Sequence, residues 1–144
     1  MSEFRFGAYD NWLKQATETI RSAEGDVANE SYSWACFKAQ QAAEYALKGM
    51  LYGLGLAASG HSVVKLAGIV ASAVDTLTFK QSCLIYLDKL YIPTRYADVY
   101  DDGSPFSFYE EPDARRGLDC ARIIIEIVTT YVSTLERRDD EEET

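Results

Sequence analysis

A row of polar side chains that could bind a ligand lies in the middle of the stretch 34–54, around which the rest of the chain is organised. Gln41, Glu44 and Lys48 are three and four residues apart, with Gln40 beside them. On a helix this spacing places an amide, a carboxylate and an ammonium group on one face. Glu44 and Lys48 then form an i,i+4 pair, worth only about 0.3–0.5 kcal/mol when exposed. The row indicates either a solvated face with a routine ion pair, or a face turned toward a dimer interface or a ligand groove.

A second group of candidate residues follows a proline. Pro93 breaks or kinks the preceding helix, and Arg95, Tyr96 and Asp98 come shortly after it. Arg95 and Asp98 are close enough to pair on a helical turn, which would fix this segment. In the other interpretation, Arg95 makes a bidentate contact with a phosphate or with a partner's carboxylate. Tyr96 is either a core aromatic residue or a platform for base stacking.

The single histidine, His61, lies in a Gly/Ser loop ahead of a predicted helix. It is interpreted either as a cap or buried hydrogen-bonding group, or as a ligand contact. The sequence contains no glycine-rich phosphate loop, no pair of catalytic carboxylates and no cluster of metal ligands. We therefore expect no metal, no cofactor and no catalytic residue.

The composition is that of one folded helical domain. The chain has 144 residues, of which 47% are hydrophobic, with only three prolines and nine glycines. Its net charge is −9, but five of the acidic residues lie at 139–143. No basic stripe alternates with aromatic residues, which argues against broad, charge-driven nucleic-acid binding and leaves a local basic pocket as an alternative. We expect one domain over 1–138 and an acidic, disordered tail over 139–144.

Hydrophobic spacing predicts five helices, over about 8–24, 34–54, 63–74, 79–91 and 112–135. Gly25 is the expected stop of the first helix, and the short turn after it makes the first two helices an antiparallel hairpin. Ser59 or Ser62 is expected to cap the third helix, and Pro112 suits the first turn of the last. Short connections then give an all-α, up-and-down bundle, with the irregular stretch 99–111 packed against it or against a partner subunit.

The three cysteines show no metal or redox spacing. Cys36, Cys83 and Cys120 are widely separated and form no C-x-x-C pair, so each is expected to be a small core residue in a reducing cytoplasm. The N-terminus has no apolar run of signal-peptide length. The most apolar stretch, 123–132, is too short to span a membrane and contains Glu126. We expect a cytoplasmic protein without membrane association.

Three segments together resemble the HEPN domain family (higher eukaryotes and prokaryotes nucleotide-binding). Residues 35–48 follow the family pattern A-x-F-x-x-Q-Q-A-x-E-x-A-L-K, and His61 stands alone ahead of the third helix. Arg95-Tyr96-Ala97-Asp98 is similar to the R-Y-P-D that precedes the last helix, with Ala97 in place of the proline. The resemblance covers essentially the whole chain.

This resemblance implies a helical homodimer that pairs with a small nucleotidyltransferase encoded beside it. Some family members are toxins in such pairs, and many of those are metal-independent ribonucleases with an arginine, four to six residues, then a histidine. Here the nearest arginine upstream of His61 is Arg21, and no histidine follows Arg95. The imidazole that would handle the proton of the 2′-hydroxyl is missing from its place, so ribonuclease activity is not expected.

Three functional hypotheses remain. The first is a nucleotide-binding or partner-binding subunit of a nucleotidyltransferase pair, without chemistry of its own. The second is a divergent ribonuclease, or toxin of a toxin–antitoxin pair, that uses His61 of one subunit near Arg95 of the other. The third is a homodimeric interaction module whose cleft binds no small molecule. The contacts expected for the first hypothesis are Gln41, Glu44, Lys48, His61, Arg95, Tyr96 and Asp98.

Overall fold

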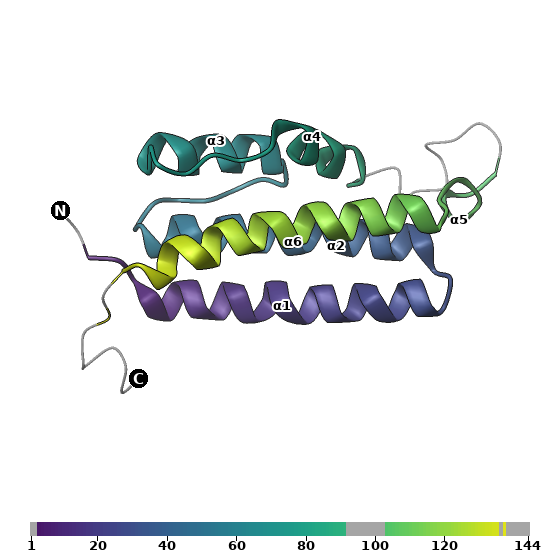
Figure 1. Ribbon diagram of the computed structural model, residues 1–144, viewed down its shortest axis with the longest axis horizontal. Helices are drawn as coiled ribbons and strands as arrows, with labels where there is room; N and C mark the ends of the chain where they lie inside the picture. The colour runs from purple at the N-terminus through teal and green to yellow at the C-terminus, as the bar shows by residue number, and fades with distance from the viewer. Residues whose placement is uncertain (1–2, 92–102, 136, 138–144) are drawn as a thin grey trace.

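The computed structural model describes residues 3–91, 103–135 and 137, and all regular structure within them is helical (Figure 1). The predicted all-α class is therefore confirmed. Five of the helices correspond to the five predicted ones, and the one-turn α5 is a sixth, within the stretch expected to be irregular. The helices are α1 (Phe6–Ala28), α2 (Tyr32–Gly53), α3 (Val63–Ala73), α4 (Gln81–Lys89), α5 (Pro105–Phe108) and α6 (Glu111–Ser133).

The central helix of the bundle is α2, which packs against α1, α6 and α3 and also contacts α4 and α5. In Figure 1, α1, α2 and α6 run side by side along the long axis, and α3 and α4 follow one another above them. Small residues of α2 permit this close packing. A Cβ at Gly49 would lie only 2.8 Å from the Trp12 Cβ of α1, so the two backbones approach closely there. As a result α2 is covered on most of its circumference.

The turn between α1 and α2 differs from its prediction. Gly25 lies inside α1, which continues to Ala28, so the expected stop at Gly25 is wrong. The reversal instead uses Glu30, whose φ of 60° lies in the left-handed region. Val27 packs against the core, and this tertiary contact outweighs the roughly 1 kcal/mol penalty of a glycine within a helix. The predicted antiparallel hairpin of α1 and α2 is nevertheless present.

The predicted caps of the later helices are largely confirmed. Ser62 is the N-cap of α3, and its Oγ accepts a hydrogen bond from the backbone N–H of Lys65. Pro112 lies in the first turn of α6, where Glu110 and Asp113 form a capping box. These local signals mark the start of each helix, and at α3 the carboxylate of Asp88 from α4 adds a tertiary contact.

The cysteines require a correction. Cys83 of α4 and Cys120 of α6 form a disulfide, with a Cα–Cα distance of 5.1 Å, so the expectation of three independent core cysteines is wrong for these two. No spacing rule could indicate the pair, because packing of α4 on α6 brings together residues 37 positions apart. Cys36 is free and buried as expected, and burial raises its pKa to about 12.

Several predictions fall on residues that the structure does not describe. Arg95, Tyr96 and Asp98, the break at Pro93 and the acidic tail over 139–144 all lie outside the described residues. Among the described helices, none combines the length and the apolar character that a membrane span needs.

Candidate functional site

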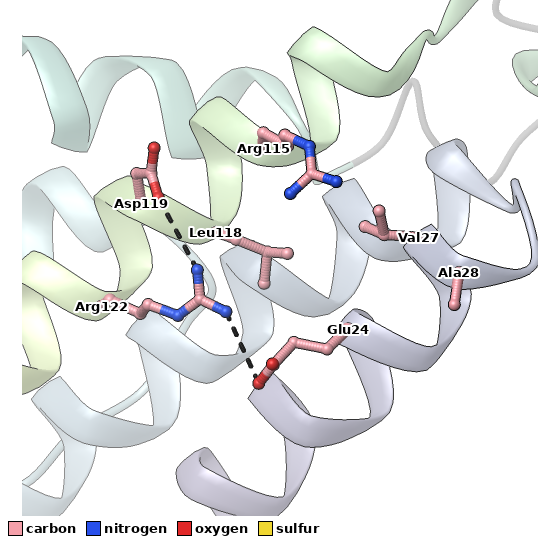
Figure 2. Close-up of a pocket in the computed structure, with 7 residues that line it drawn as sticks. All are labelled: Glu24, Val27, Ala28, Arg115, Leu118, Asp119 and Arg122. Atoms are coloured by element: carbon pink, nitrogen blue, oxygen red, sulfur yellow. Dashed lines mark ion pairs between the residues drawn. The ribbon is translucent and has the colours of Figure 1, made fainter.

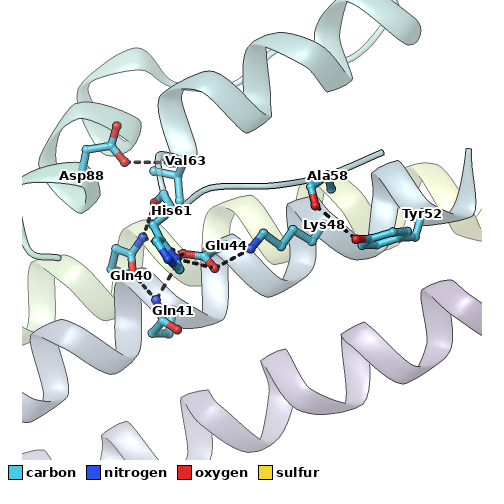
Figure 3. A network of polar contacts seen from close by, with 9 residues as sticks. All are labelled: Gln40, Gln41, Glu44, Lys48, Tyr52, Ala58, His61, Val63 and Asp88. Atoms are coloured by element: carbon cyan, nitrogen blue, oxygen red, sulfur yellow. Dashed lines mark hydrogen bonds and ion pairs between the residues drawn. The ribbon is translucent and has the colours of Figure 1, made fainter. Parts of the chain in front are cut away.

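The polar row predicted on α2 surrounds a buried carboxylate (Figure 3). Glu44 is only 2% exposed. Its Oε2 accepts a hydrogen bond from Lys48 Nζ at 3.0 Å, and its Oε1 lies 3.1 Å from His61 Nδ1. The amides of Gln41 and Gln40 donate to the same Oε1 at 3.2 and 3.3 Å. Four side chains therefore converge on one carboxylate, and we call this group the Glu44 cluster.

The histidine of the cluster lies in the loop between α2 and α3. Gln40 donates a hydrogen bond of 2.7 Å to the backbone carbonyl of His61. Asp88 of α4 holds the next residues, because its carboxylate accepts the Ser62 hydroxyl at 2.7 Å and the first two backbone N–H groups of α3 at 2.7 and 3.4 Å. A carboxylate at a helix N-terminus is also favoured by the helix dipole. Asp88 of α4 thus holds the residues that directly follow His61, and so helps to fix the position of the histidine.

An aromatic residue covers the imidazole. The rings of Tyr91 and His61 are stacked, with centroids 4.6 Å apart and planes at 15°. Tyr91 also lies 6.0 Å from Phe37, which contacts Trp34 at 6.2 Å, so a row of aromatic rings leads away from the cluster along α2. Trp34 is 51% exposed. The cluster therefore lies beside a partly exposed aromatic surface.

One side of the cluster is buried in the protein and the other side is exposed to solvent. The side chain of Lys48 is 12% exposed, whereas that of His61 is 54% exposed. With Nδ1 facing Glu44, the other ring nitrogen of His61, Nε2, remains for a group outside the protein. The arrangement presents an imidazole of fixed orientation, backed by a buried negative charge and beside an ammonium group. Such a surface can bind a polar ligand or a partner, and can hold or transfer a proton.

The structure brings together four of the residues singled out in the sequence: Gln41, Glu44, Lys48 and His61. The expected Glu44–Lys48 pair forms, but the interpretation of a solvated face fails because Glu44 is buried. No pattern in the sequence indicated that His61 joins this row. Sequence reasoning placed Gln40 beside this row without a role in it, and missed the contributions of Asp88 and Tyr91. Only the adjacency of Gln40 to Gln41 carried any signal, because Asp88 and Tyr91 reach the site through tertiary packing.

A separate hollow of about 360 Å³ lies between α1 and α6 (Figure 2). Its two arginines already face carboxylates: Arg115 pairs with Glu111 at 2.6 Å, and Arg122 lies 3.5 Å from Glu24. The hollow contains no residue of the Glu44 cluster. Within the described part of the chain, no group of three or more potential ligands could hold a metal ion. The Glu44 cluster is therefore the best-defined candidate site.

Comparisons with known proteins agree with this fold. The family model of the HEPN domain matches residues 9–132. TT1696 from Thermus thermophilus is 38% identical, with a TM-score of 0.78 over 85% of this chain and 96% of that one. ST0689, described as an archaeal HEPN homologue, is 34% identical, with a TM-score of 0.68 over 92% and 99% of the two chains. A HEPN domain protein from Thermotoga maritima, TM0613, is 26% identical, with a TM-score of 0.68 over 87% and 99%.

No curated protein gave a significant match. The family match spans most of the chain, and the structural likeness extends over nearly the whole length of each of these relatives. The chain belongs to the HEPN domain family.

Proposed function

We propose that this chain is the nucleotide-binding or partner-binding subunit of a pair formed with a small nucleotidyltransferase. The observation that carries the proposal is the buried Glu44 carboxylate, which holds the half-exposed His61 beside the largely buried Lys48. Burying a charge costs free energy unless the charge is paired. Buried charged groups next to an open surface are common at functional sites, so the position of Glu44 favours a binding role for this cluster. The sequence lacks the arginine–histidine spacing of the family's ribonucleases, which supports binding rather than catalysis.

The chemistry of the cluster suits an anionic, aromatic ligand such as a nucleotide. The ammonium group of Lys48 supplies positive charge for phosphate oxygens. The stacked rings of Tyr91 and His61 border the same surface and suit the flat face of a base. Arg95 follows Tyr91 by four residues, and four residues span at most about 14 Å. We propose Arg95 as a further phosphate contact, with Tyr96 and Asp98 as candidate ligand- or partner-binding residues; all three lie outside the described residues.

A homodimer is part of the same proposal. Three residues with exposed surface, Trp34, Phe37 and Gln41, follow one another at steps of three and four along α2, so they share a face. The exposed ring of Trp34 at one end gives this face apolar area that a second copy would bury. In an isologous interface, the same face of both copies meets around a two-fold axis.

One observation favours the ribonuclease as a second candidate. Glu44 lies against Nδ1 of His61, which is how a carboxylate orients an imidazole whose Nε2 exchanges a proton. The second candidate requires Arg95 of the partner subunit to meet His61, and Arg95 lies outside the described residues. Of the two residues that the ribonuclease site needs, only His61 is therefore described.

We expect the purified chain to bind at least one of the four common ribonucleoside triphosphates, and Arg95→Ala to weaken that binding tenfold or more. Loss of one charge-assisted contact of about 1.4 kcal/mol has this effect on Kd. Isothermal titration calorimetry with each triphosphate measures it. The matched control is Arg21→Ala, which removes an exposed arginine of α1 that pairs with the exposed Glu18. An Arg95→Ala variant with the wild-type Kd would remove Arg95 from the site.

A further inference from the structure

The disulfide between α4 and α6 is linked to the Glu44 cluster through α4. We propose that Cys83 and Cys120 form a redox-controlled clamp, whose opening by a dithiol releases the contacts that hold His61 in place. The proposal concerns regulation of the same site, so its functional meaning rests on the proposed binding role. The structural effect on His61 does not depend on any ligand.

The first step is the path from the disulfide to the histidine. Cys83 lies in the first turn of α4, and Asp88 lies near the end of the same helix. Asp88 accepts the hydrogen bonds that fix Ser62 and the start of α3, directly after His61. Tyr91, just beyond α4, stacks on the His61 ring. The hydrogen bonds of Asp88 and the stacking of Tyr91 therefore both depend on the position of α4, which the disulfide joins to α6.

The second step is the weakness of α4 as an independent element. It has nine residues, fewer than the roughly 12–15 that an isolated helix needs to be even marginally stable. Its position depends on tertiary contacts, of which the disulfide is the covalent one. Leu84 and Leu87 are buried, and the Tyr86 hydroxyl donates to the Asp113 carbonyl at 2.9 Å. These contacts keep α4 near the bundle after reduction, so we expect local loosening rather than unfolding.

The third step is the covalent loop that the disulfide closes. Cys83 and Cys120 are 37 positions apart, and the loop that their bond closes includes Tyr91. Opening the bond removes this covalent constraint on the segment that carries Tyr91. A dithiol would therefore act through a single bond on the contacts that Asp88 and Tyr91 make to the histidine loop.

The reaction is an ordinary two-electron thiol–disulfide exchange. One thiolate of the dithiol attacks the sulfur of Cys83 or Cys120, and the protein S–S bond breaks as a mixed disulfide forms. The second thiol of the dithiol then displaces the cysteine, so the dithiol leaves as a disulfide and both cysteines end as protonated thiols. Cys83 and Cys120 are 5% and 4% exposed, so attack requires α4 to move first. Cys36 is buried, and its raised pKa of about 12 keeps it a thiol that does not compete.

The single histidine makes the test direct, because the chain gives one set of imidazole ring signals in an NMR spectrum. Spectra of the ligand-free chain are recorded before and after reduction with dithiothreitol. The ring signals should move on reduction, toward the position seen in oxidised Tyr91→Leu, where the stacking partner is absent. The Cys83→Ala/Cys120→Ala double variant should show the reduced position with or without dithiothreitol. Cys36→Ala, which keeps the disulfide, should respond to dithiothreitol as the wild type does.

Two results would overturn the proposal. In one, the His61 signals are the same in the oxidised and reduced chains, which leaves the disulfide without influence on the site. In the other, circular dichroism shows that reduction unfolds the whole bundle. The disulfide then stabilises the entire fold and does not act specifically on the His61 contacts. No nucleotide or partner is present, so either result leaves the proposed binding function to be judged on its own test.

Discussion

Replacing Glu44 with alanine should lower the free energy of unfolding by about 2–4 kcal/mol. The carboxylate is 2% exposed and accepts from Gln40, Gln41 and Lys48, with His61 against it. Without it, the buried amide of Gln40 loses a partner and the ammonium of Lys48 has no counter-charge. Removing one member of a buried charge pair typically costs about 3–5 kcal/mol. The expected loss is somewhat smaller because Lys48 and His61 can turn toward water.

Urea unfolding of wild type and Glu44→Ala, followed by circular dichroism, measures this difference. Glu18→Ala is the matched control, because Glu18 also forms an ion pair on a helix but is 62% exposed. Exposed pairs contribute little to stability, so the control should unfold almost as the wild type does. Equal unfolding midpoints for Glu44→Ala and Glu18→Ala would show that the Glu44 cluster behaves as an ordinary surface pair.

Loss of the disulfide should lower the free energy of unfolding by about 3–4 kcal/mol. The bond joins residues 37 positions apart, and closing a loop of that size restricts the unfolded chain by this amount. The expected result is a lower urea midpoint for Cys83→Ala/Cys120→Ala than for oxidised wild type, and a similar decrease for wild type treated with dithiothreitol.

The free cysteine provides the control for this measurement. Cys36 is buried and unpaired with another cysteine, so Cys36→Ala should still lose stability when dithiothreitol is added. The double variant should not respond to dithiothreitol at all. If oxidised and reduced wild type unfold at the same urea concentration, the disulfide contributes nothing to stability.

The helices were predictable because their signals are local. Alternating steps of three and four run along α6, and its buried positions Ala114, Leu118 and Val128 follow them. Ser62 and Pro112 mark helix starts through the backbone groups of their own first turn. The expected stop at Gly25 was wrong because tertiary packing outweighed a local preference.

The candidate site was predictable only in part. The spacing of Gln41, Glu44 and Lys48 placed them on one face, but local spacing gives no information on burial. Glu44 is buried because the loop before α3 lies over it, with His61 at its carboxylate. The contribution of Asp88 and the Cys83–Cys120 bond depend on how α4 packs. These contacts join segments 17 to 37 residues apart, and no short motif records them.

The most direct test of the proposed function is capture of partners from native cell extract, with bound proteins, nucleotides and RNA analysed together. The baits are wild type, Lys48→Ala from the Glu44 cluster, and Lys14→Ala from the exposed face of α1. We predict that wild type and Lys14→Ala retain a small nucleotidyltransferase or a nucleotide, and that Lys48→Ala retains much less. Recovery of cleaved RNA, or of the chain with no other molecule, would contradict the binding-subunit function.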